Sequence, residues 1–295
     1  MNLKVKNALI SVSDKENLVS LIKILKKFNV NIISSGGTYS SIRKLGYQCT
    51  ELSRYTGFKE MLDGRVKTLH PKIHAGILHD RQNKKHKSEM SEQNFPAIDL
   101  IVVNFYPFQK IVLNTKNPEK IIENIDIGGP TMVRAAAKNF KNVTIITSKN
   151  DYESLIEELK KFKGKTSLKF RELMSSRAFG LTAYYDAMIA HWFNKRLQVE
   201  FPERKTIFGR KLQDLRYGEN PHQRSSLYVY DYNDRQLGFN QVHGKELSYN
   251  NFNDMYASLE ILNSLKKNSG TVIIKHANPC GVSENKVPLI SFKNA

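Results

Sequence analysis

Short apolar segments alternate with helical ones through the first half of the chain, and this alternation limits the possible folds more than any other feature. Residues 5–12 are apolar enough for a buried strand, and residues 16–28 carry apolar side chains at helical spacing. A second strand-like segment at 30–34 leads into another helix. This order predicts a doubly wound parallel sheet of the α/β class. Ligands of such sheets bind at the carboxyl ends of the strands.

Later segments continue the pattern and then interrupt it. Strands are predicted at 98–104 and 143–147, and a long helix at 168–195 carries apolar side chains that suit a core or a subunit interface. A charged segment that contains proline follows this helix. We therefore expect two domains, residues 1–203 and residues 204–295.

The second domain has few predicted elements for its length. Strand-like segments lie at 226–230 and 236–243, a helix at 253–267, and an apolar, buried strand at 271–276. A region with so few strands can build only a small core. We expect an incomplete α/β domain.

A stretch rich in cationic side chains, residues 63–76, falls between the predicted elements. It holds two glycines, a proline, two histidines, an arginine and two lysines in fourteen residues, without helical or strand periodicity. It is typical of a loop that enters a short helix after Pro71 and grips an anionic substrate. His70, His74 and His79 could suggest a metal site, but no carboxylate pair accompanies them, so we expect pocket-wall or surface positions and no metal.

The Ser-Ser-Gly-Gly-Thr segment that ends at Thr38 suits phosphate binding. Its glycines allow close backbone approach, its hydroxyls can donate, and the next helix offers free N–H groups. The same residues also make an ordinary turn. Ser13, Lys15, Arg65 and Lys67 are predicted at the same sheet edge, and together they favour phosphate.

Three further positions carry candidate chemistry. Tyr106 follows a predicted strand and precedes proline, although a structural tyrosine is equally compatible with this pattern. Arg134 and Lys138 share a helix face, which is usually a solvated face, but this helix is otherwise apolar. Lys275 and His276 end a predicted strand, a place that suits a general base.

Composition limits the class of protein. The 295 residues include no apolar run long enough for a membrane span, no signal peptide, and two distant cysteines, so we expect a soluble cytoplasmic protein with reduced thiols. The net charge of +18 could indicate nucleic-acid binding. The lysines are spread along the chain and no nucleic-acid signature occurs, so a preference for anionic small molecules, with no nucleic-acid partner, is favoured.

Six motifs occur in the order found in one enzyme family: Ser-Val-Ser-Asp-Lys, Ser-Gly-Gly-Thr, Asp-Gly-Arg-Val-Lys-Thr-Leu-His-Pro, Asn-Phe-Tyr-Pro-Phe, Ile-Asp-Ile-Gly-Gly and Arg-Ala-Ala-Ala-Lys-Asn. The chain resembles the bifunctional purine biosynthesis family, which joins an IMP cyclohydrolase to an AICAR formyltransferase. The resemblance covers essentially all of the chain, although family members are longer. It implies a methylglyoxal-synthase-like cyclohydrolase domain, followed by a truncated, cytidine-deaminase-like formyltransferase domain.

The resemblance also implies site residues, and those of the first domain lie within the six motifs. Catalytic roles would belong to Lys67, Tyr106, Asp126 and Lys138, with Lys138 as the first choice for proton donor and acceptor, and to Lys275 and His276 in the second domain. Nucleotide contacts would come from Ser13, Asp14, Lys15, Ser35, Gly36, Gly37, Thr38, Arg65, Val66, Thr68, Asn104, Phe105, Ile127, Arg216, Tyr217 and Asn250.

The implied reaction cyclises formyl-AICAR (FAICAR) to IMP with loss of water and uses no cofactor. The formyltransferase half of the family takes AICAR, with 10-formyltetrahydrofolate as co-substrate, and we expect no useful formyl transfer from this chain alone. The resemblance further implies a homodimer. The alternative is a non-catalytic nucleotide or phosphate sensor on the same scaffold, which could dispense with Lys67, Asp126 and Lys138; all three are present.

Overall fold

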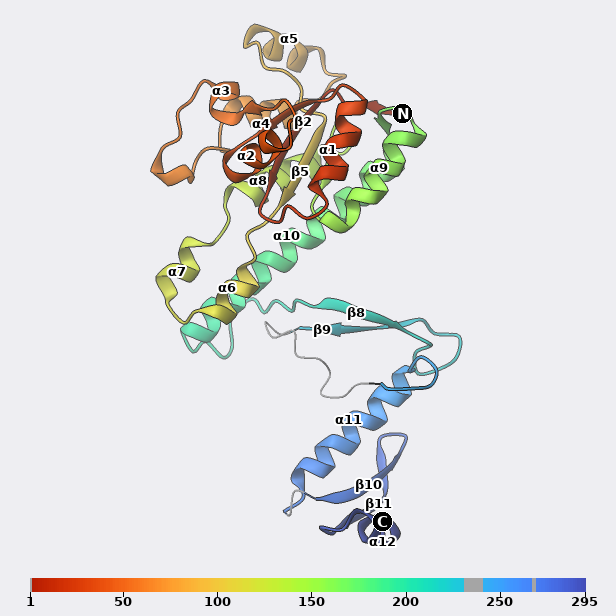
Figure 1. The fold of residues 1–295 in the computed structure, drawn as a ribbon. Coiled ribbons are helices and arrows are strands. Elements are labelled where there is room, and N and C mark those ends of the chain that lie inside the picture. The colour runs from red at the N-terminus through yellow and green to blue at the C-terminus, as the bar shows by residue number, and fades with distance from the viewer. Residues whose placement is uncertain (1, 231–240, 267–268) are drawn as a thin grey trace. The chain divides into compact units, whose positions relative to one another are not determined.

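A computed structural model describes the chain apart from residues 1, 231–240 and 267–268 (Figure 1). The described chain forms two compact units, Met1–Thr206 and Ile207–Ala295. Among the described residues, no helix combines the length and the apolar character that crossing a membrane requires.

The first unit is built on a five-stranded parallel sheet with the order β4-β3-β2-β5-β6. Its strands, from one edge to the other, are β4 (Thr50–Glu51), β3 (Asn31–Ser34), β2 (Asn7–Val12), β5 (Leu100–Asn104) and β6 (Thr144–Ile146). The chain winds outward from β2 in one direction through β3 and β4, and then returns to the other side of β2 through β5. The doubly wound parallel sheet predicted from the alternation is confirmed, and its direction reverses between β2 and β5.

Helices cover the sheet because its central strands are apolar on both faces, as parallel strands require (Figure 1). In the described residues α8 packs on β5 and β6, and both α4 and α10 pack on α8. The helices of this unit are α1 (Leu18–Lys27), α2 (Gly36–Lys44), α3 (Leu52–Thr56), α4 (Pro71–Leu78), α5 (Lys84–Glu92), α6 (Phe108–Asn114), α7 (Pro118–Glu123), α8 (Gly128–Lys138), α9 (Tyr152–Lys161) and α10 (Leu168–Arg196). Two short 3-10 turns, η1 (Leu62–Gly64) and η2 (Lys149–Asp151), and the antiparallel pair β1 (Leu3–Lys4) and β7 (Lys165–Thr166) complete it.

The second unit contains two antiparallel hairpins and two helices. The hairpins are β8 (Arg210–Leu215) with β9 (Ser225–Val229), and β10 (Gly270–Lys275) with β11 (Asn278–Glu284); the helices are α11 (Tyr249–Ser264) and α12 (Pro288–Asn294). The prediction of a buried strand at 271–276 is wrong in one respect, because β10 stays partly exposed and, among the described residues, pairs with β11 alone. Most of the strand predicted at 236–243 lies outside the described residues.

A buried carboxylate at the amino ends of β2 and β5 fixes the register of the sheet. Asp99 is 3% exposed and accepts hydrogen bonds from the backbone N–H groups of Lys6 and Asn7, both at 2.7 Å. Arg81 Nη1 donates to its other oxygen at 2.6 Å. One side chain therefore ties the start of β2, the start of β5 and the segment after α4 together at the edge opposite to the carboxyl ends.

Replacing Asp99 with alanine is expected to lower the free energy of unfolding by about 3 kcal/mol, because Arg81 and two backbone donors lose a buried partner. Urea denaturation measures the loss. The matched control is Glu89→Ala, which removes an exposed carboxylate paired with Lys85 at 3.9 Å and is expected to cost at most about 0.5 kcal/mol. Equal losses in the two variants would contradict the role given to Asp99.

Candidate active site

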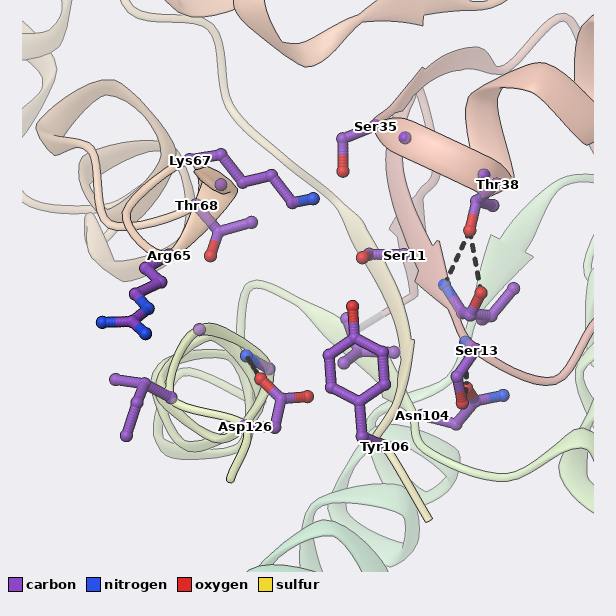
Figure 2. A pocket seen from close by; sticks show the side chains of 18 of the residues that line it. Ser11, Ser13, Ser35, Thr38, Arg65, Lys67, Thr68, Asn104, Tyr106 and Asp126 are labelled. Carbon is purple, nitrogen blue, oxygen red and sulfur yellow. Dashed lines mark hydrogen bonds between the residues drawn. The ribbon is translucent and has the colours of Figure 1, made fainter. Parts of the chain in front are cut away.

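A cavity of about 850 Å³ opens at the carboxyl ends of β2 and β5, where the direction of the sheet reverses (Figure 2). Ligands of doubly wound sheets bind at this place because the loops diverge there and leave a crevice. Most residues predicted for the first domain line it. They are Ser13, Lys15, Ser35, Gly36, Gly37, Thr38, Arg65, Lys67, Thr68, Asn104, Tyr106, Asp126 and Ile127.

The side chain of Asn104 joins the ends of β2 and β5 at the floor of this cavity. Its Oδ1 accepts from the backbone N–H of Ser13 at 2.6 Å and from the Ser13 hydroxyl at 2.9 Å. Its Nδ2 donates to the carbonyl of Asp14 at 3.2 Å. The turn after β2 is thereby held by the last residue of β5, which explains why an amide side chain suits this position.

The hydroxyl of Thr38 ties α2 to β2 and does not point at a ligand. It accepts from the backbone N–H of Val12 at 3.1 Å and donates to the Val12 carbonyl at 2.9 Å, and the residue is buried. Thr38 lines the cavity, but its hydroxyl is engaged with the backbone of β2. What remains for a ligand is the helix N-terminus itself, with unpaired N–H groups and its positive dipole end.

Two ammonium groups flank this N-terminus. Lys67 Nζ lies 3.6 Å from the position that a Cβ atom on Gly36 would occupy, and Lys15 Nζ lies at the same distance from that position on Gly37. Gly36 also has a left-handed φ of +51°, which favours glycine. Figure 2 shows the Lys67 side chain extended towards Ser35. The start of α2 therefore combines backbone donors with two cations, an arrangement suited to a phosphate group.

The opposite wall of the cavity comes from the cationic loop, residues 63–76, and from the start of α8. Thr68 is buried, and its hydroxyl lies so close to Gly128 that a Cβ atom there would overlap it. Arg65 is exposed and forms an ion pair with Glu123, which also lines the cavity. As predicted, the loop enters a short helix, α4, at Pro71. The Gly-Gly pair of the Ile-Asp-Ile-Gly-Gly motif thus serves close packing between two chain segments.

Asp126 is the acidic group of this wall. Its Oδ1 accepts from the backbone N–H of Gly129 at 2.8 Å, and a Cβ atom on Gly129 would come within 2.5 Å of Oδ2. Burial raises the pKa of Asp126 above its ordinary value, while the backbone N–H groups of Gly129 and Tyr106 and the charge of Lys67 partly oppose that rise. The carboxyl group is therefore close to a cation and poised to exchange a proton.

Tyr106 completes the cavity from the end of β5. Its side chain is 51% exposed, and its ring stands between Asp126 and Asn104 with the hydroxyl directed into the cavity (Figure 2). A tyrosine with a packing role would be buried. Its exposure therefore favours contact with a ligand over the structural alternative.

Tyr185 on α10 supports Asp126 and was predicted only as core or interface. It is 3% exposed, and its hydroxyl accepts the backbone N–H of Asp126 at 2.8 Å. Its ring packs against Phe105 in a tilted contact, with 5.0 Å between the ring centroids, and edge-on against Phe108 at 6.1 Å. Fifty-nine residues separate Tyr185 from Asp126, so no local sequence signal links them. Phe105 accordingly lies behind the cavity wall instead of lining it.

Replacing Tyr185 with phenylalanine is expected to lower kcat for the cyclisation that the family resemblance implies about tenfold, with KM within twofold. The turn at Asp126 loses a partly buried hydrogen bond while the ring packing stays. A looser turn admits water, so the acid limb of the pH–rate profile should move to lower pH. The matched control is Tyr152→Phe. Its buried hydroxyl has no hydrogen-bond partner among the described residues, so kcat should not change. Equal kcat values in both variants would contradict the role given to Tyr185.

Four residues predicted for the first domain do not line this cavity. Asp14 pairs with Lys149, Phe105 packs on Tyr185, and Val66 is not among the residues that line the cavity. Lys138 is exposed and is the last residue of α8, whose first residue, Gly128, lines the cavity. Ten residues of helix place it about 15 Å along the axis from that end. Lys138 therefore does not line the cavity, and its place among the reacting groups stays a prediction.

The residues predicted for the second unit gather around the start of α11. Asn250 Nδ2 donates to the Glu219 carbonyl at 3.0 Å, and Arg216 lies over the Tyr217 ring at 4.8 Å. Lys275 ends β10, and His276 follows it with a left-handed φ of +54°. Asp254, one turn after Asn250, accepts the backbone N–H of Ala277 at 2.7 Å. Helix α11 thus joins Arg216, Tyr217 and Asn250 on one side to Lys275 and His276 on the other.

His70, His74 and His79 do not form a metal-binding cluster. In the part of the chain that the structure describes, no three His, Cys, Asp or Glu side chains lie close enough together to hold a metal ion. Burial lowers the pKa of His74 and of His79, which favours neutral imidazoles at physiological pH. His70 instead caps α4, with its Nδ1 accepting from the backbone N–H of Lys72 at 3.1 Å.

Fold and cavity together define an α/β protein of the doubly wound class, with a crevice lined by Lys15, Arg65 and Lys67 at its topological switch point. Sequence comparison gives the particular family. The pattern of the AICARFT/IMPCHase bienzyme family matches residues 136–295, and that of the MGS-like domain matches residues 17–131. The chain belongs to the AICARFT/IMPCHase bienzyme family. The predicted family and its methylglyoxal-synthase-like fold are therefore confirmed.

Individual relatives agree with this assignment. The chain is 44% identical over 297 residues to the bifunctional purine biosynthesis protein PurH of Bradyrhizobium diazoefficiens, covering 99% of this chain and 56% of the relative. It is 45% identical to PurH of Persephonella marina, with 98% and 57% covered. The chain thus spans little more than half the length of these relatives. A crystal structure of ForH matches with a TM-score of 0.58 and 31% identity, over 64% of this chain and 97% of ForH.

Proposed function

We propose that the first unit cyclises FAICAR to IMP. The observation that carries this proposal is that one cavity joins a helix N-terminus flanked by two lysines to the partly buried carboxyl group of Asp126, beside Tyr106. The lysine end suits a ribose phosphate, and the Asp126 end suits proton transfer at a heterocycle. Membership of the PurH family supports purine biosynthesis as the setting.

The chemistry assigns a task to each group. The carboxamide nitrogen attacks the formyl carbon, so a C–N bond forms and the formyl oxygen gains negative charge. Asp126, ionised, accepts the proton that the amide nitrogen loses. Lys67 and the Tyr106 hydroxyl stabilise the developing oxyanion and protonate it. The C–O bond then breaks as a C=N double bond forms to the former formamide nitrogen, which gives up its proton, so the two protons lost by the two nitrogens leave with the oxygen as water. No cofactor enters this balance. Holding both arms of the substrate together removes much of the barrier.

Two measurements on the purified chain test the proposal. Calorimetry should detect IMP binding that inorganic phosphate weakens by competition, and ultraviolet absorbance should show FAICAR converted to IMP. Binding of IMP without turnover would instead identify the non-catalytic sensor. Absence of both would overturn the proposal.

For the second unit we propose contacts with AICAR through Arg216, Tyr217 and Asn250, with His276 as the base for the amine and Lys275 as transition-state support. His276 and Ala277 form the two-residue turn between β10 and β11, with φ of +54° and +59°, and this turn holds His276 next to Lys275. The co-substrate of this second activity would be 10-formyltetrahydrofolate. We expect no useful transfer from this chain by itself, and an assay with both substrates tests that expectation.

We also propose a homodimer that forms through α10. Leu173 and Phe179 are exposed apolar side chains on this helix, with 49% and 39% of their surface accessible. Light scattering at several concentrations measures the mass of the particle.

A cytoplasmic location is also proposed, since the free thiols of Cys49 and Cys280 suit a reducing compartment.

A further inference from the structure

Lys149 holds the two acidic residues that flank Lys15. It begins the η2 turn after β6, and its Nζ lies 2.9 Å from Asp14 Oδ2 and also pairs with the Glu16 carboxylate. Its side chain is 32% exposed and those of Asp14 and Glu16 are 49% and 62% exposed, so both ion pairs lie at the protein surface. Lys149 does not line the cavity, and none of the roles described above involves it.

The turn that contains Asp14 and Glu16 sends alternate side chains in two directions. Asp14 and Glu16 reach Lys149 on one side. Lys15, between them, reaches the start of α2, where its Nζ lies 3.6 Å from the Cβ position of Gly37 and 3.5 Å from the Ser13 carbonyl. The Asn104 amide holds the backbone of the same turn from β5. Lys149 is therefore a second support, from the neighbouring strand β6, for the turn that aims Lys15.

The charges point the same way. Two carboxylates beside a phosphate site would oppose phosphate binding, because like charges repel over the Debye length of about 8 Å at physiological ionic strength. Lys149 offsets part of that charge and draws both carboxylates away from the side on which Lys15 stands. Asp14, which the sequence suggested as a nucleotide contact, thus acts through Lys149.

We propose that Lys149 is a positioning residue that aims Lys15 at the phosphate of the bound nucleotide by holding Asp14 and Glu16. This inference rests on the proposed function, in that the cavity must bind a nucleotide phosphate. It assigns to Lys149 an effect on ground-state binding alone, because the phosphate is bound in the same way before and during the reaction.

The test is calorimetric titration of the full chain with IMP. Lys149→Met is expected to weaken IMP binding about fivefold, in keeping with partly exposed ion pairs, and to raise KM for FAICAR similarly with kcat within twofold. Lys149→Arg should restore binding to within twofold. In a Lys15→Met background the Lys149→Met change should have almost no further effect, because the side chain that it aims is gone. Lys85→Met, which removes one exposed lysine in an ion pair remote from the cavity, is the control for net charge and should leave the affinity unchanged.

Each outcome decides one question. If the unaltered chain does not bind IMP, the proposed function fails and this inference fails with it. If the chain binds IMP but Lys149→Met binds equally well, only the inference is overturned. Independent, multiplying effects of Lys15→Met and Lys149→Met would also overturn it, because Lys149 would then act without Lys15. Should Lys149→Met melt well below the unaltered chain, Lys149→Gln provides the same comparison.

Discussion

Replacing Lys67 with methionine is expected to lower kcat for FAICAR cyclisation about a thousandfold. Lys67 is the cation that serves both ends of the cavity, because its Nζ lies 3.6 Å from the Cβ position of Gly36 and its charge acts on Asp126. Methionine keeps the aliphatic stem but removes the charge and the proton donor. The loss combines electrostatic stabilisation of the oxyanion with general acid catalysis, each worth about a hundredfold or more.

Single-turnover absorbance measurements separate this chemical step from binding. IMP affinity is expected to fall much less than kcat, since Lys15 and the α2 N-terminus remain in place. Lys85→Met is again the matched control, because it removes one charge at an exposed ion pair and should leave kcat unchanged. A loss below tenfold in Lys67→Met would exclude Lys67 from the reacting groups.

Much of this cavity could be predicted because it is built at strand ends. Periodicity identified β2, β3 and β5, and parallel strands bring their carboxyl ends to one edge, so Ser13, Ser35 and Asn104 were expected to meet. The turn after each strand then supplies polar groups whatever the detailed packing. This argument needs only the order of elements along the chain.

Two parts of the cavity depend on information that periodicity does not contain. The Gly-Gly pair that begins α8 lies against Thr68 and Asp126, and tertiary packing alone brings these groups so close together. Tyr185 reaches Asp126 from a helix distant in sequence, and only tertiary packing brings that contact about.

Replacing Asp126 with asparagine is expected to lower kcat about a thousandfold while leaving the protein at least as stable at neutral pH. Asparagine keeps an oxygen for the Gly129 N–H, so the turn survives, but it cannot accept the proton of the carboxamide nitrogen. In the unaltered chain kcat/KM should rise with pH through the pKa of Asp126, which burial raises above its ordinary value. The asparagine variant should lose this acid limb.

The expected effect on stability follows from the direction in which the pKa of Asp126 is shifted. A carboxyl group whose pKa is raised in the folded protein stabilises the fold below its unfolded pKa, and this contribution is lost as pH rises through the folded pKa. Above that range ionised Asp126 opposes folding, and asparagine does not. Urea midpoints of the two proteins should therefore differ at pH 7 in favour of asparagine, with a smaller gap near pH 3. Asp80→Asn, at an exposed carboxylate, should change neither activity nor midpoint. If the asparagine variant keeps a tenth of the activity, or retains the acid limb, Asp126 does not accept the proton. If activity is lost while stability is undiminished, the carboxylate of Asp126 serves the reaction and not the fold.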